Sequence, residues 1–149
     1  MNPSTVRTRI LQDHAVLRED LRKLEVEVDA MHAHPARRPE IANLARGLLS
    51  QLIAHTEAED EVLAPALRDL DAWGAIRATM LLDHHESQRV QLRRLIEVYG
   101  GGEGDRKWLA QLTIEWIYDV RADMVHEETS VLSAALLKDD FIDVAMESG

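Results

Sequence analysis

The sequence predicts an all-α protein: an up-down-up-down antiparallel four-helix bundle with a short C-terminal tail. Breaker-rich stretches divide the 149 residues into four long segments. Apolar residues recur every three or four positions within these segments, and none shows the alternation of a strand. This length is typical of one domain, and short connections favour antiparallel neighbours. We therefore expect a single bundle domain over residues 1–149, with helices at about 5–33, 39–68, 72–99 and 105–137.

Proline, glycine and aspartate set the expected helix boundaries. The first helix should begin after Pro3 or Ser4 and end near HAHPARRP, where the prolines forbid continuation. Pro39 suits the first turn of the second helix, which Pro65 should kink or end. Two residues are candidate caps for the third helix, Asp69 and Asp71. GGGEGD forms the clearest loop before the fourth helix, and the weakly periodic KDDFIDVAMESG forms the tail.

Charge and composition exclude several classes of function. A formal net charge of -10 argues against nucleic acid and anionic membranes as partners, because like charges repel. The sequence contains no cysteine, so any metal must be bound through nitrogen and oxygen. The N-terminus lacks the apolar region of a secretory signal, and no apolar run approaches the roughly 20 residues of a membrane span. We therefore expect a cytoplasmic protein that binds neither nucleic acid nor membrane.

Polar side chains interrupt the apolar seam of each predicted helix. The first seam reads Val6, Ile10, His14, Leu17, Leu21, Leu24, Val28, Met31. The second reads Ile41, Leu44, Leu48, Leu52, His55, Glu59, Val62, Ala66. The third reads Leu81, His85, Gln88, Leu92, Leu95, Tyr99. The spacing of three or four residues in this third seam is kept only when His85, rather than the adjacent His84, faces the core.

The fourth helix allows more than one register. Its best apolar stripe reads Leu109, Leu112, Trp116, Val120, Asp123, Glu127, Val131, Ala134. A register through Met124 and Glu128 would bury Arg121. A register through His126 would bury a set of polar residues, Asp119, Ser130 and Ser133. The pattern therefore favours Asp123 and Glu127, and it leaves open whether His84, His126 or Glu128 replaces an assigned ligand.

Antiparallel connections place these polar residues at one height in the bundle. Ionisable groups are costly in a core unless they are paired or bound to a cation. Arg89, one turn after His85, is the basic residue best placed to partner a carboxylate instead. We interpret six residues as metal ligands, namely His14, His55, Glu59, His85, Asp123 and Glu127. Three imidazoles and three carboxylates are more ligands than one tetrahedral zinc ion can bind, and they suit two ions bridged by Glu59 and Glu127. Mixed nitrogen and oxygen donors of this kind favour iron or manganese.

The chain resembles the hemerythrin-like, HHE cation-binding family of four-helix bundles. The matching segments are ILQDHAVLREDL, HTEAEDEVLAPAL, DHHESQR and DMVHEETSVLSAALLKDD, in that order along the chain. The resemblance implies a non-haem di-iron site held by His14, His55, Glu59 and His85. On the last helix, Asp123 occupies a position where the family usually has histidine, with Glu127 four residues later. The implied cofactor is two iron ions with an oxo or hydroxo bridge, with manganese or zinc as substitutes.

Two departures from the family pattern bear on function. Arg89 stands where oxygen-carrying hemerythrins have a second histidine on the third helix. A carboxylate at Asp123 adds negative charge that should stabilise ferric iron, which disfavours reversible oxygenation. We therefore expect a protein that binds or senses oxygen, peroxide, nitric oxide or iron, rather than an enzyme, with a small diatomic or peroxide ligand as its partner. The alternatives are a di-iron oxidase or peroxidase-like enzyme and a metal-free helical interaction module; the sequence identifies no protein partner.

Overall fold

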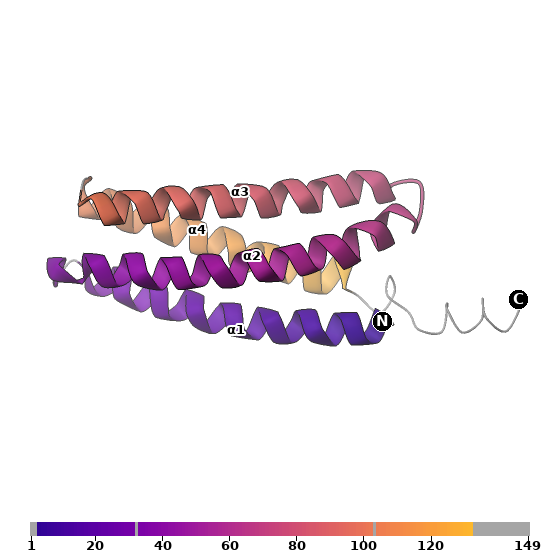
Figure 1. Cartoon of the computed structure of the whole chain (residues 1–149), viewed down its shortest axis with the longest axis horizontal. Helices are drawn as coiled ribbons and strands as arrows, with labels where there is room; N and C mark the ends of the chain where they lie inside the picture. The colour runs from indigo at the N-terminus through magenta and orange to yellow at the C-terminus, as the bar shows by residue number, and fades with distance from the viewer. Residues whose placement is uncertain (1–2, 32, 103, 133–149) are drawn as a thin grey trace, which may run out of the picture.

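The computed structural model describes residues 3–31, 33–102 and 104–132. Its four long helices are α1 (Pro3–Ala30), α2 (Arg38–Arg68), α3 (Gly74–Gly101) and α4 (Arg106–His126). Two short elements are the 3₁₀ turn η1 (Pro35–Arg37) and the π-helical turn η2 (Glu127–Val131). Figure 1 shows the connections alternating between the two ends of the bundle, which confirms the antiparallel four-helix prediction. The predicted tail and the end of the predicted fourth helix, residues 133–137, lie outside the described residues.

Two helix ends differ from the sequence-based expectation. α1 ends at Ala30 because the next backbone N–H groups bond to carbonyls three residues back, as Met31 N does to Val28 O at 3.2 Å. α3 ends two residues later than expected, at Gly101, so the first glycines of the expected loop remain helical. Gly102 then stops the helix with a φ of 70°, a left-handed conformation that glycine adopts without steric cost.

Three residues near the turn between α2 and α3 have roles that differ from the sequence-based expectation. α2 passes through Pro65, which is exposed in the last turn, and ends at Arg68 with Asp69 as its C-terminal cap. Asp71 accepts hydrogen bonds from Trp73 N at 2.9 Å and from Arg77 at 2.8 Å. Asp71 therefore fixes the turn that precedes α3, whose cap position is Trp73.

The predicted seams of α1 and α3 are confirmed, because every residue in them is buried. The second seam is wrong beyond Glu59. Val62 is 39% exposed, whereas Leu63 is 1% exposed and Leu67 is also buried. This part of α2 packs against the beginnings of α1 and α3, so the buried row continues in steps of four residues from Glu59.

The π-helical turn changes the register at the end of the fourth seam. Leu132 N bonds to Glu127 O at 2.6 Å, five residues back rather than four. Leu132 is therefore buried and Val131 only half-buried, contrary to the sequence-based seam. Met124 is also buried, although the predicted seam had excluded it, and Ala134 lies outside the described residues.

Two apolar clusters stand on either side of a polar layer. One cluster extends from Leu17 and Leu52 toward the α1–α2 and α3–α4 connections. The other contains Ile10, Leu63 and Leu81 near the α2–α3 turn. All of the predicted ligands except Asp123 fall between the two clusters along their helices, so packing on both sides shields the polar layer from water.

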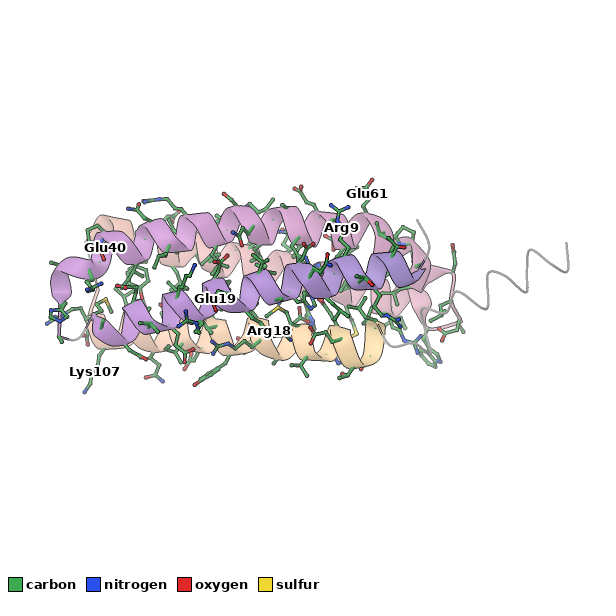
Figure 2. All side chains as sticks on the ribbon, turned by 90° about the horizontal axis from the view of Figure 1, so that it is seen from below. Arg9, Arg18, Glu19, Glu40, Glu61 and Lys107 are labelled. Carbon is green, nitrogen blue, oxygen red and sulfur yellow. The ribbon has the colours of Figure 1, made fainter. Side chains whose placement is uncertain are left out.

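Charged side chains such as Glu61 and Lys107 point away from the bundle (Figure 2). Among the described helices, none is long and apolar enough to cross a membrane.

Replacing Gly74 with alanine should destabilise the protein by about 1–3 kcal/mol, because the backbone must shift to admit the new atom. A Cβ atom on Gly74 would lie 1.9 Å from Leu67 O and 2.8 Å from Arg68 O. The matched control is Gly47→Ala within α2, where a Cβ meets nothing within 4 Å. That change should stabilise the protein by about 0.5–1 kcal/mol. Urea unfolding measures both; equal effects would contradict the close packing at the α2–α3 turn.

Candidate metal centre

Donor side chains from all four helical segments meet in the polar layer. Five of the six predicted ligands are buried, namely His14, His55, Glu59, His85 and Glu127. His55 and Glu59 are four residues apart on α2, so one helical face presents both of them. The structure therefore brings side chains together that are more than one hundred residues apart in the sequence.

Glu59 and Glu127 lie between the same two imidazoles. The Nε2 atom of His14 is 3.1 Å from Glu59 Oε1 and 3.1 Å from Glu127 Oε2. The Nε2 atom of His85 is 3.1 Å from Glu59 Oε2 and 2.9 Å from Glu127 Oε1. Each carboxylate thus turns one oxygen toward His14 and the other toward His85.

The donor atoms form two overlapping groups. The first consists of His14, His55, Glu59 and Glu127. The second consists of His85, Asp123 and Glu127. Within each group the donor atoms lie within 4.8 Å of one another, and Glu127 belongs to both. The arrangement can hold a metal cation in each group, with a carboxylate shared between them.

Asp123 stands at the edge of the second group. Its side chain is 14% exposed, and Gln88 donates a hydrogen bond to its Oδ2 atom at 2.8 Å. His84, which is 56% exposed, lies 3.6 Å from its Oδ1 atom. The core face of α4 at this level is shared with Met124, which is buried, so Asp123 reaches the layer from the flank of the helix.

The side chains of the polar layer do not supply a hydrogen-bond donor for every buried carboxylate oxygen, and this favours a bound cation. The Oε2 atoms of Glu59 and Glu127 are buried and have no hydrogen-bond partner. Each lies 3.1 Å from an imidazole Nε2, but that nitrogen carries a single proton, which the other carboxylate takes. A buried carboxylate oxygen without a partner is costly, and metal coordination removes that cost.

The two central imidazoles are strongly basic while protons are the only cations in the layer. Burial lowers the pKa of His14, but the adjoining carboxylates of Glu127, Glu59 and Glu128 outweigh it and raise the pKa to about 10. Burial likewise lowers the pKa of His85, but the adjoining carboxylates of Glu127 and Glu59 raise it to about 11. The layer therefore demands positive charge, which either protons or metal ions can supply.

The two central carboxylates differ in their affinity for protons. Burial raises the pKa of Glu59, but the three histidines beside it hold that pKa well below its usual range. Burial raises the pKa of Glu127 above its usual value. The nearby imidazoles of His14 and His85 oppose this increase, and the negative charges of Glu59 and Asp123 add to it. Glu127 is therefore the central carboxylate that most lacks compensating positive charge.

A second carboxylate contacts the outer nitrogen of each histidine. His85 Nδ1 lies 2.7 Å from Asp60 Oδ1, His14 Nδ1 lies 2.9 Å from Glu128 Oε2, and His55 Nδ1 lies 3.3 Å from Asp13 Oδ2. A carboxylate can only accept, so Nδ1–H donates in each pair. This contact fixes the ring, and once the Nε2 proton has left, the Nε2 lone pair is available for a cation.

Arginine side chains hold two of these outer carboxylates. Arg18 donates to both oxygens of Glu128, at 2.8 and 2.6 Å, and Figure 2 places Arg18 where α1 runs beside α4. Arg89 donates to Thr56 Oγ1 at 2.6 Å and lies 3.9 Å from Asp60 Oδ2. Arg89 therefore faces the outer carboxylate of His85 and not the central pair.

The structure shows where the three residues lie that the sequence left open as alternative ligands. His84 and His126 are exposed, and neither belongs to a donor group among the described residues. Glu128 contacts Nδ1 of His14, on the side of the ring away from Glu59 and Glu127, so it supports a ligand position without sharing it.

Sequence reasoning missed the outer carboxylates because it assigned only the core-facing residues. Each is adjacent in the sequence to a predicted ligand, as Asp13 is to His14, Asp60 to Glu59 and Glu128 to Glu127. Neighbours on a helix differ by about 100° around its axis, so they flank the seam and reach the next helix. An acidic residue beside three of the predicted ligands, His14, Glu59 and Glu127, was therefore an available signal.

The sequence matches the hemerythrin family, described as the hemerythrin HHE cation binding domain, over residues 5–136. Neither the comparison with curated proteins nor that with solved structures gave a match. The matched residues cover most of the chain and include every donor of the polar layer. This chain therefore belongs to the hemerythrin HHE cation-binding family, and its buried histidines and glutamates form a group that can hold metal cations.

Proposed function

We propose that the protein is a non-haem di-iron protein that binds or senses oxygen, peroxide, nitric oxide or iron itself. The proposed ligands are the six side chains of the two donor groups, His14, His55, Glu59, His85, Asp123 and Glu127. The single observation that carries the proposal is that Glu59 and Glu127 each present one oxygen to His14 and the other to His85.

This arrangement supports two ions rather than one. Carboxylates that bridge two metals must turn their two oxygens toward different sets of donors. Glu59 and Glu127 both do so, whereas a single central ion would need the four oxygens to converge. The mixed nitrogen and oxygen donors suit iron or manganese, and six side chains leave coordination positions open for a small ligand on two octahedral ions.

The described residues would bind, orient and shield the metal pair. The outer carboxylates fix the imidazole rings through Nδ1, and the apolar clusters on both sides keep bulk water away from the polar layer. Bound iron would supply the redox chemistry and the affinity for diatomic or peroxide ligands. Asp123 adds a third carboxylate, which favours the ferric state over reversible oxygen carriage.

A metal-free interaction module accounts less well for the interior. Such a module would retain buried carboxylate oxygens without a hydrogen-bond partner on Glu59 and Glu127. Natural cores rarely keep such groups because each one lowers stability. Bound cations would provide a partner for both of these carboxylate oxygens.

Replacing His55 with alanine should abolish stoichiometric iron and the near-ultraviolet absorption of the bridged ferric pair. The imidazole contacts Glu59 directly, so its loss removes one donor and a contact that positions another. Iron analysis and an optical spectrum, before and after dithionite, measure the outcome. His34→Ala is the matched control, since His34 is exposed, and it should retain wild-type iron. Unchanged iron in the His55 variant would refute the ligand assignment.

Replacing Glu128 with glutamine should weaken iron binding by about 10–100-fold, because the Nδ1 contact of His14 loses its negative charge. The same change leaves the Arg18 guanidinium without its ionic partner. Anaerobic competition against an iron(II) chelator measures the affinity. Glu57→Gln removes an equal charge from an exposed position on α2 and should leave the affinity unchanged. Equal affinities in the two variants would show that Glu128 has no supporting role.

A further inference from the structure

Gln88 is a buried amide that interrupts the apolar seam of α3 one turn after His85. Its Nε2 atom donates to Oδ2 of Asp123 at 2.8 Å. The main-chain carbonyl of the same residue accepts from Nε1 of Trp116, which is also buried, at 3.0 Å. Trp116 and Asp123 lie about two helical turns apart on α4. Gln88 is therefore bonded to α4 at two levels, and its amide stays beside Asp123.

The support for Asp123 differs from the support for the histidine ligands. The outer nitrogen of each histidine contacts a carboxylate, whereas Asp123 contacts an amide. A carboxylate only accepts hydrogen bonds, so the side chain that supports it must donate. An arginine in this place would donate too, but its positive charge would compete with a cation for Asp123. The neutral amide fixes the carboxylate and leaves its negative charge available to a cation.

Asp123 lies between a buried partner and an exposed one. On the exposed side, His84 Nδ1 is 3.6 Å from its Oδ1 atom, and the His84 side chain is 56% exposed. On the buried side is the shorter contact, to Gln88. An exposed charged contact of this kind contributes little to stability. The Gln88 bond is therefore the contact that holds the Asp123 carboxylate on the core side of α4.

We infer that Gln88 is a positioning residue, whose amide holds Asp123 in the second donor group and thereby controls the occupancy of the metal position beside His85. This inference rests on the proposed function. Among the described residues, the Gln88 side chain bonds to Asp123 and to no member of the first donor group. Gln88 should therefore influence one of the two ions and leave the other unchanged.

The test removes each of the two contacts to Asp123 in turn. Gln88→Met keeps an unbranched side chain of similar size but has no donor. His84→Ala is the matched control, because it removes the contact on the exposed side. Anaerobic titration of the metal-free proteins with iron(II), in competition with a chelator, measures how many ions each protein holds and how tightly. Urea unfolding of the metal-free proteins shows whether each variant is folded.

We expect Gln88→Met to bind one ion as tightly as the wild type and the other about tenfold more weakly, as the loss of a residue that orients a ligand produces. His84→Ala should weaken neither ion. If Gln88→Met fails to fold, Gln88→Leu decides. Wild-type affinity for both ions in the folded Gln88 variant, or equal weakening of both ions, would overturn the inference.

A double-mutant cycle separates positioning from packing. If Gln88 acts through Asp123, adding Gln88→Met to Asp123→Ala should change the affinity for the weaker ion by less than about twofold. A tenfold loss in both backgrounds would show that Gln88 acts through packing, and would overturn the inference while leaving the proposed function intact. Wild-type protein without stoichiometric iron would contradict the proposed function, and the inference with it.

Discussion

The structure depends on two carboxylates, Glu59 and Glu127, that are buried in the centre of the bundle and shared between imidazoles of different helices. Burying such groups is costly unless positive charge surrounds them. This need for positive charge fixes the position of each helix along the bundle axis, because His14 and His85 must contact the same two carboxylates. It also explains the division of the core, since apolar clusters close the layer on both sides and keep bulk water from replacing the intended partners.

The outer carboxylates extend this constraint from the layer to the whole bundle. Asp13 on α1 bonds to a histidine of α2, Asp60 on α2 to a histidine of α3, and Glu128 in η2 to a histidine of α1. Each bond therefore crosses from one helix to a neighbour. Because these bonds orient the rings, the proposed ligands are positioned before any cation arrives. Among the six proposed ligands, Asp123 is the least enclosed, and a cavity of about 350 Å³ between α3 and α4 opens beside it.

Helical periodicity predicted the four-helix bundle and the inward positions on α1 and α3, since the apolar steps there are regular. It also led to the six donors, which break those steps at one level. It failed where backbone geometry departs from an ideal helix. The π-helical turn at Glu127 shifts burial from Val131 to Leu132, and no residue type in the sequence predicts such a turn. Pairings such as Glu128 with His14 depend on how helices face one another, which the seam of a single helix does not contain.

In the proposed di-iron protein, two cations lie side by side between Glu59 and Glu127. Anomalous diffraction at the iron edge from crystals of the iron-loaded protein tests this arrangement most directly. Two peaks are expected, one beside His14 and His55 and the other beside His85 and Asp123, with Glu59 and Glu127 between them. A single peak, or none with water molecules bonded to the buried carboxylate oxygens, would contradict it.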